Sequence, residues 1–262
     1  MDLEQIGAAM KEQLYMIPLN DAVNANDECP FCFIERNIEQ DLIDLVLGSS
    51  ASYMESDIRE ATDKAGFCRT HFKKMFDYGN KLGNGWILKT HYIRTIREMQ
   101  KEFSSFKPGK AAHKGFFKKA GESSNSIVNW IRAKEDSCYV CNYFKDTYAR
   151  YLDTFFYLWK QDEAFRSKVT NGKGFCLSHF GDLCEAADSQ LSESDREDFY
   201  AVLLPLMERN MERVSEDVSW LVDKFDYRYK DADWKNSRDA VQRGMQKLKG
   251  GYPADAPFVS SK

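Results

Sequence analysis

Cys29-Pro-Phe-Cys32 decides the fold of this chain together with three partner stretches, Cys68-Arg-Thr-His71, Cys138-Tyr-Val-Cys141 and Cys176-Leu-Ser-His179. A Cys-x-x-Cys stretch is followed by a Cys-x-x-His stretch after 35 residues in the first copy and after 34 in the second. Gly-Phe precedes the third cysteine and Phe follows the histidine in both copies. Such a recurrence is far more than isolated buried cysteines would produce, so the sequence predicts a duplicated metal-binding plan.

The spacing within each stretch suits a tetrahedral metal site. Two cysteines separated by two residues at a bend can both face one ion, and Cys-x-x-His in the first turn of a helix adds two ligands one turn apart. Helix N-termini also favour the thiolate form of cysteine. We therefore predict eight metal ligands, which are Cys29, Cys32, Cys68, His71, Cys138, Cys141, Cys176 and His179.

Three thiolates and one imidazole per site favour zinc, with two ions in the chain. An iron-sulfur cluster is the alternative cofactor, because cysteine with an occasional histidine also holds such clusters. A catalytic zinc keeps an open position for water, whereas each set here offers four ligands. The closed ligand sets favour structural metal over metal-assisted hydrolysis.

Sequence alone leaves the pairing of the four stretches open. Each copy can close its own site, or the Cys-x-x-Cys of one copy can meet the Cys-x-x-His of the other. We expect local closure within each copy, because the shorter loop costs less chain entropy by on the order of 1 kcal/mol.

Apolar spacing of about 3.6 residues dominates the chain and strand-like alternation is scarce, so the fold class is predicted as all-α. The pattern predicts two tandem repeats of about four helices, each with its own Cys3His site. In the first repeat we expect one helix after Cys32, a second over 56–65, a third from about Cys68 to Gly79 and a fourth over 86–103, with Ile93, Ile96 and Met99 on its apolar side.

The second copy repeats this order. An aromatic-rich helix follows Cys141, and Ser194 with Glu197 resembles a capping box that opens a long helical pattern. Pro205 lies inside that pattern, where we expect a kink or the beginning of a helix. One more helix is expected over 237–248.

The expected domains are a helical metal-binding repeat at 1–103, a linker at 104–126, a second metal-binding repeat at 127–230, and a C-terminal helix with a loose tail at 231–262. The linker is rich in Gly, Ser and Lys, and we interpret it as a solvated hinge rather than an anion-binding loop. Cys184 is expected in the core, and neither His91 nor His113 is expected to bind metal.

Composition narrows the function. The chain has 262 residues and a formal net charge of -4, which argues against a nucleic-acid partner. The sequence begins Met-Asp-Leu-Glu-Gln and shows no secretory leader of basic residues followed by an apolar stretch. No apolar run is long enough for a membrane span. We therefore expect a cytoplasmic protein with no membrane partner. Catalytic signatures such as a Walker loop, Gly-x-Ser-x-Gly or His-Glu-x-x-His do not occur.

These observations predict a non-enzymatic, zinc-binding helical protein that presents a surface to a protein partner. Aromatic residues make up 14% of the chain. Most of them are expected to pack between helices, and some can form such a surface. The alternatives are a redox-responsive thiol and zinc switch, and an iron-sulfur protein in electron transfer or sensing.

Three further features resemble a known family. They are Pro18-Leu-Asn-Asp-Ala22 before the first Cys-Pro-x-Cys, the two copies of Gly-Phe-Cys-x-x-His-Phe, and Lys-Phe-Asp-Tyr-Arg at 224–228. Together they resemble an uncharacterised bacterial family, domain of unknown function 6062. The resemblance implies the repeat architecture and a prokaryotic cytoplasmic setting, and it implies no activity.

Overall fold

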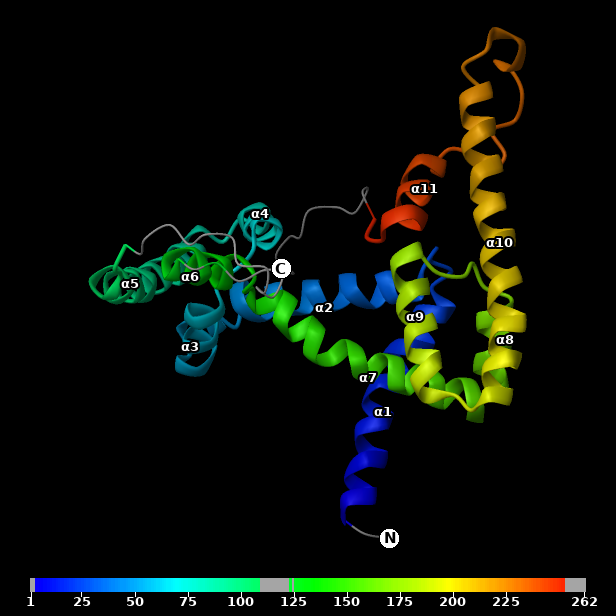
Figure 1. Cartoon of the computed structure of the whole chain (residues 1–262). Coiled ribbons are helices and arrows are strands. Elements are labelled where there is room, and N and C mark those ends of the chain that lie inside the picture. Colours follow the sequence, from blue (N-terminus) through cyan, green and yellow to red (C-terminus); the bar gives the residue numbers. More distant parts are fainter. Residues whose placement is uncertain (1–2, 109–122, 124, 253–262) are drawn as a thin grey trace. The chain divides into compact units, whose positions relative to one another are not determined.

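The computed structural model describes residues 3–108, 123 and 125–252, with side chains from Leu14 onward. Within these residues the chain forms α-helices and two short 3-10 helices and no strand, which confirms the all-α prediction (Figure 1). The helices are α1 Leu3–Asn24, α2 Pro30–Leu47, α3 Ser56–Ala65, α4 Arg69–Tyr78, α5 Lys81–Ser105, α6 Ser126–Glu135, α7 Tyr139–Gln161, α8 Glu163–Thr170, α9 Leu177–Gln190, α10 Glu193–Asp223 and α11 Ala240–Lys249, with 3-10 turns at Ser52–Met54 and Tyr227–Tyr229.

Local sequence signals explain most helix ends. Gly66 ends α3 and Gly79 ends α4, both at positive φ, as the sequence predicts. The expected capping box at Ser194 is wrong, because Ser192 caps α10 by accepting a hydrogen bond from the Asp195 backbone N–H. No helix begins at Pro205, since α10 runs through it.

The chain divides into two compact units that do not coincide with the expected repeats at 1–103 and 127–230. Unit 1 comprises residues 1–38 and 146–256, and unit 2 comprises 39–145 and 257–262. The boundaries fall inside α2 and α7. Each unit therefore combines segments from both sequence copies, with unit 2 inserted in the chain of unit 1.

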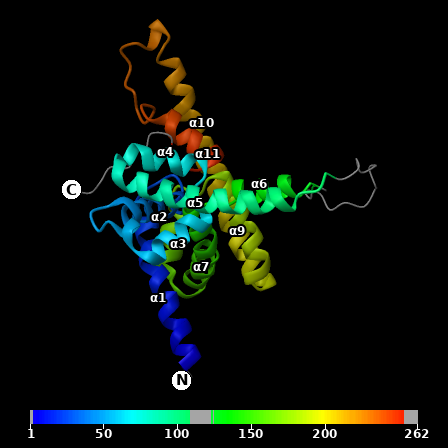
Figure 2. The ribbon, with the colours of Figure 1, turned by 90° about the vertical axis from the view of Figure 1, so that its left-hand side faces the viewer.

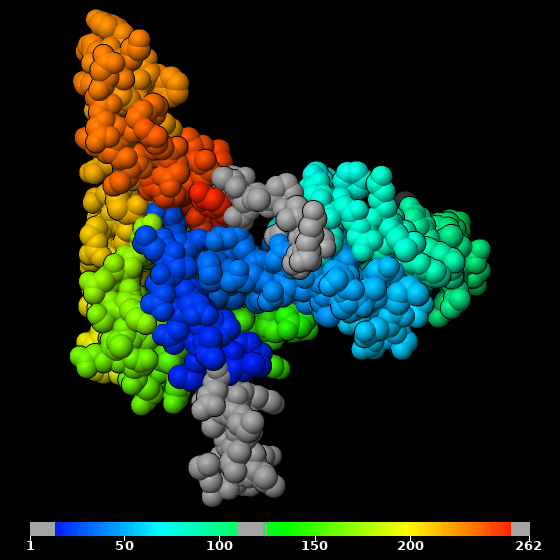
Figure 3. Space-filling model, turned by 180° about the vertical axis from the view of Figure 1, so that it is seen from behind, coloured from blue at the N-terminus to red at the C-terminus, as the bar shows by residue number. Residues whose placement is uncertain are grey.

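Unit 1 is built around aromatic side chains. α8 packs on α1 and α10, and α11 packs on α9 and α10. Figure 3 shows α11 and the segment before it, in orange and red, lying along α10. The fully buried core includes Phe31, Phe155, Phe165, Phe175 and Phe199. Phe155, Phe156 and Trp159 of α7 are thus core, as expected of such spacing, whereas Tyr143 and Tyr157 of the same helix are 46% and 40% exposed.

Unit 2 is built around α5. It contacts α3, α4 and α6, and Figure 2 shows α5 and α6 side by side. Ile43, Leu47, Met75 and Ile87 are buried, whereas Ile93 and Ile96 are 52% and 44% exposed. The expectation that these two isoleucines face the core is wrong, because α6 and the other neighbours cover a different side of α5.

The expected linker at 104–126 lies largely outside the described residues, as do His113 and the tail beyond Tyr252. The described ends show α5 reaching Ser105 and α6 beginning at Ser126, capped by Asn125. The expected C-terminal helix is confirmed as α11.

Candidate metal centres

All eight predicted ligands gather into two groups of four. The first cluster is Cys29, Cys32, Cys176 and His179 in unit 1, and the second cluster is Cys68, His71, Cys138 and Cys141 in unit 2. In each group the four ligand atoms lie within 4.8 Å of one another. The prediction of local closure is therefore wrong: each Cys-x-x-Cys meets the Cys-x-x-His of the other copy.

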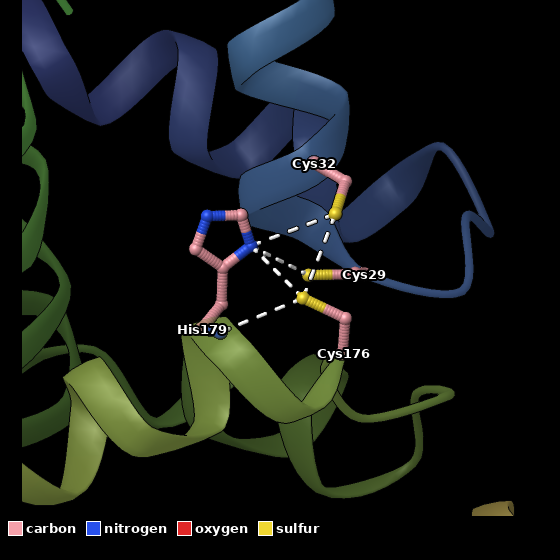
Figure 4. A group of neighbouring side chains, drawn as sticks. All are labelled: Cys29, Cys32, Cys176 and His179. Atoms are coloured by element: carbon pink, nitrogen blue, oxygen red, sulfur yellow. Dashed lines mark hydrogen bonds between the residues drawn. The ribbon is translucent and has the colours of Figure 1, made fainter. Parts of the chain in front are cut away.

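The first cluster joins the start of α2 to the start of α9 (Figure 4). The Nδ1 atom of His179 lies 3.3 Å from Cys29 Sγ, 3.5 Å from Cys32 Sγ and 3.3 Å from Cys176 Sγ. The sulfurs of Cys32 and Cys176 are 3.7 Å apart. All four side chains are buried, so the cluster lies inside the core of unit 1.

Cys176 also caps α9. Its Sγ accepts a hydrogen bond from the His179 backbone N–H at 3.5 Å. The helix N-terminus therefore favours negative charge on this sulfur. The rings of Phe31 and Tyr148 each lie 5.6 Å from the His179 ring, centroid to centroid, and hold the imidazole in place.

The second cluster repeats this geometry at the starts of α4 and α7. His71 Nδ1 lies 3.1 Å from Cys68 Sγ, 3.2 Å from Cys138 Sγ and 3.5 Å from Cys141 Sγ. The sulfurs of Cys68 and Cys141 are 4.0 Å apart. Cys138 and His71 are buried, while Cys68 and Cys141 are half-buried. The second cluster is thus the more accessible of the two.

Both histidines turn the same nitrogen to the thiols, and the other nitrogen of His71 has a carboxylate partner. Nε2 of His71 lies 2.8 Å from Glu39 Oε1, and Lys74 pairs with the second oxygen of Glu39. A metal-bound imidazole usually donates its free N–H to such a carboxylate, which fixes the ring and its tautomer. Glu39 was missed by sequence reasoning because it lies on α2, whose Cys32 belongs to the other cluster.

The ionisable groups of the clusters influence each other strongly. Burial opposes protonation of His71 and His179, but their hydrogen bonds with Cys138 and Cys176 respectively raise the pKa of each to about 10. Burial raises the pKa of the Cys138 thiol, but its hydrogen bond with His71 outweighs this and lowers the pKa to about 6. In the first cluster, hydrogen bonds from Cys29 and Cys32 lower the pKa of Cys176. Hydrogen bonds with Cys176 and Cys29 raise the pKa of Cys32, and burial raises the pKa of Cys141 to about 12. A metal cation binds these groups as thiolates and neutral imidazoles, so metal binding at both clusters must release their protons.

A C-terminal segment covers the first cluster. Gly250, just after α11, has a φ of 77°, and a Cβ atom placed on it would lie 3.5 Å from the sulfurs of both Cys32 and Cys176. Within the same helix, Lys247 is buried and its Nζ donates to the carbonyl of Glu28, the residue before Cys29, at 2.6 Å. The sequence pattern predicted α11 but gave no signal that it lies over a ligand set.

The remaining candidates lie outside both clusters. His91 Nδ1 is 2.9 Å from the carbonyl oxygen of Asp63, so this ring belongs to helix packing in unit 2. Cys184 is half-buried on α9, and burial raises the pKa of its thiol. Neither contributes to the metal-capable groups found among the described residues.

The fold and these sites define an all-α protein with two Cys3His clusters, each able to hold a metal ion. A family model described as a family of unknown function, DUF6062, matches residues 10–255. The chain therefore belongs to this family. Comparison with curated proteins and with solved structures found no match. Among the described residues, no helix is long and apolar enough to cross a membrane.

Proposed function

We propose that each cluster holds one zinc ion and that both ions are structural, so that the chain is a non-enzymatic scaffold. The observation that carries this proposal is the spacing of the ligand atoms. Tetrahedral zinc, with bonds of about 2.3 Å to sulfur and about 2.0 Å to nitrogen, places two thiolates about 3.8 Å apart and a thiolate about 3.5 Å from an imidazole. The sulfur pairs at 3.7 and 4.0 Å and the sulfur to nitrogen distances of 3.1–3.5 Å match these values.

The same spacing favours a single ion over an iron-sulfur cluster. In an iron-sulfur cluster, cysteines bind different iron atoms. Their sulfur atoms therefore lie further apart than those of cysteines that bind one shared ion. Here each set of four ligand atoms lies within 4.8 Å. Three soft thiolates with one imidazole favour zinc among the common mononuclear ions.

A structural role follows from the full ligand sets. Three thiols and one imidazole complete a tetrahedron, which leaves no position for a reacting water. Each cluster also joins segments far apart in sequence, with Cys32 and Cys176 separated by 144 positions. Binding a metal across such a separation stabilises the fold directly, by roughly 10 kcal/mol or more for a structural zinc site.

Elemental analysis of anaerobically purified protein, with a visible spectrum of the same sample, tests the cofactor. We expect two zinc ions per chain and no visible absorption. Iron with absorption in the visible range would overturn the zinc assignment. Chelation should then abolish the helical circular dichroism of the metal-loaded chain, and a chelated, metal-free chain with full helical signal would overturn the structural role.

A protein partner is the second part of the proposal, supported by exposed apolar side chains. On α5 these are Leu82, Leu88, Tyr92, Ile93, Ile96 and Phe103, and in the segment after α10 they include Phe225 and Tyr227, which are 83% and 86% exposed. Large exposed aromatic side chains often mark interaction surfaces. The test compares the proteins bound by the wild type with those bound by an Ile93→Glu, Ile96→Glu double variant whose metal content is unchanged. Loss of a bound protein in the variant would support a binding surface on α5. Identical binding by both would contradict such a surface.

A thiol switch at the second cluster is a further candidate function, favoured by one observation. Cys68 and Cys141 are half-buried, whereas all ligands of the first cluster are buried. Exposed thiolates are oxidised first. Dilute peroxide should therefore release the metal of the second cluster first, while the first cluster keeps its metal. Release of neither metal, or of both together, would count against a switch.

A further inference from the structure

We propose that unit 1 contains a binding site for a small phosphate-bearing anion in a pocket separate from the metal clusters. The pocket has a volume of about 480 Å³, within the range of small-molecule sites. Five basic side chains line it, and they are Lys173, Arg213, Lys235, Arg238 and Arg243. They come from the turn before α9, from α10, from the segment between α10 and α11, and from α11.

Three of the basic side chains that line the pocket also surround the buried carboxylate of Glu28. Glu28 is 3% exposed, and its Oε2 accepts a hydrogen bond from Arg213 Nη2 at 2.6 Å and lies 3.2 Å from Lys247 Nζ. Its Oε1 has no hydrogen-bond partner in the part of the chain that the structure describes, and it lies 3.7 Å from Arg243 and 3.9 Å from Lys173. One buried carboxylate thus faces four cations, which it cannot neutralise.

The acidic residues of the wall do not restore the balance. Asp217 and Asp239 both bind Arg243, each at 2.9 Å. The lining holds five basic side chains against two acidic ones, an excess of three positive charges. The whole chain has a net charge of -4, so this concentration of positive charge is local. A concave polar pocket with such an excess attracts anions.

Lys235 and Arg238 of the lining are called the rim of the pocket below. Among the described residues, Lys235 and Arg238 make no side-chain ion pair, and they lie over the rings of Trp220 and Trp234, at 4.1 and 5.8 Å from the ring centroids. Arg243 is fully engaged below them, because its third nitrogen donates to the Asn236 carbonyl. Arg243 is therefore held in place, while Lys235 and Arg238 can bind a ligand.

The arrangement of donors favours phosphate over carboxylate. A carboxylate presents its acceptor sites in one plane, whereas a phosphate offers oxygens on several sides and carries more charge. Here the cations converge from four separate segments of the chain. Such a cradle suits a multiply charged tetrahedral group.

Isothermal titration calorimetry of the full, metal-loaded chain with pyrophosphate and with inorganic phosphate, at about 150 mM salt, tests this site. We expect saturable binding at one site per chain. Arg238→Ala and Lys235→Ala should each weaken it by about tenfold, since each removes one charge-assisted contact. The matched control is Lys249→Ala, an exposed lysine of α11 outside the pocket, which should bind like the wild type.

Three results would overturn the proposal. The first is no saturable binding to the wild type, and the second is unchanged affinity in both rim variants. The third is an equal loss in Lys249→Ala, which would indicate general charge attraction. Equal affinity for succinate at the same ionic strength would overturn the phosphate assignment in particular. Metal content is measured on every variant, so a defect in the clusters is distinguished from a defect in the pocket.

Discussion

Glu39 Oε1 lies 2.8 Å from Nε2 of His71, while Nδ1 of the same ring faces the thiols of the second cluster. Glu39 is held by Lys74 on its other oxygen. The carboxylate therefore fixes both the tautomer and the orientation of a metal ligand that lies on a different helix. Among the described residues, no carboxylate is bonded to His179 Nε2, so the two clusters differ in this support.

Glu39→Gln should weaken metal binding at the second cluster by about 10- to 100-fold, because an amide orients the imidazole less well than a carboxylate. Competition with a chromogenic chelator measures the affinity of each site in turn. The first cluster should be unaffected. Glu60→Gln, an exposed position on α3, is the matched control, and an affinity equal to wild type in Glu39→Gln would show that the carboxylate has no such role.

Crossed pairing of the half-motifs makes a prediction about metal stoichiometry. The double variant Cys29→Ser, Cys68→Ser damages both clusters as the structure pairs them, whereas Cys29→Ser, Cys176→Ser damages only the first. We expect close to no bound metal in the former and one ion per chain in the latter, measured by elemental analysis. The reverse result would mean that each copy closes its own site.

Gly250 should be sensitive to substitution for two separable reasons. Its φ of 77° and ψ of -173° lie in a region essentially restricted to glycine, so Gly250→Ala costs about 1–3 kcal/mol in strain, and its methyl group would also contact the sulfurs of Cys32 and Cys176. We expect lower stability in urea denaturation together with weaker metal binding at the first cluster. Gly251→Ala shares a positive φ but meets nothing within 4 Å, so it should lose stability and keep its metal affinity. Equal metal affinity in both variants would contradict the contact.

Lys247 should be among the residues most important for stability in unit 1. Its side chain is 1% exposed, and its Nζ donates to the carbonyls of Glu28 and Lys173 and lies 3.2 Å from the Glu28 carboxylate. Lys247→Met removes the donor to the buried carbonyls of Glu28 and Lys173, while Arg213 still pairs with the Glu28 carboxylate, so we expect a cost of about 1–3 kcal/mol in the free energy of unfolding. Lys249→Met, two residues away and exposed, should change it by less than about 0.5 kcal/mol. Similar values for both variants in urea denaturation would contradict this role.

The metal ligands and their pairing show which structural features the sequence determined. Helical periodicity, Gly66 and Gly79 as stop signals, and the three-residue spacing of the ligands all act within one or two helical turns. These local signals predicted the helix content, most helix starts and the ligand positions that the clusters bring together. They could not decide which half-motifs meet, because the two Cys-x-x-Cys stretches offer identical donors, and so do the two Cys-x-x-His stretches.

Tertiary packing decided the pairing, and aromatic neighbours of the ligands give the reason. Phe31, between the first two cysteines, packs on Phe175, the residue before Cys176, with ring centroids 5.9 Å apart. In the second cluster Phe67 lies 6.0 Å from Tyr139, whose backbone N–H donates to the Gly66 carbonyl at 2.8 Å. Loop closure favours local pairing by only about 1 kcal/mol, while burying one such aromatic side chain contributes about 2 kcal/mol. The sequence by itself therefore determined the helices and the ligand-type residues, and the packing of distant aromatic side chains decided which of those residues share a site.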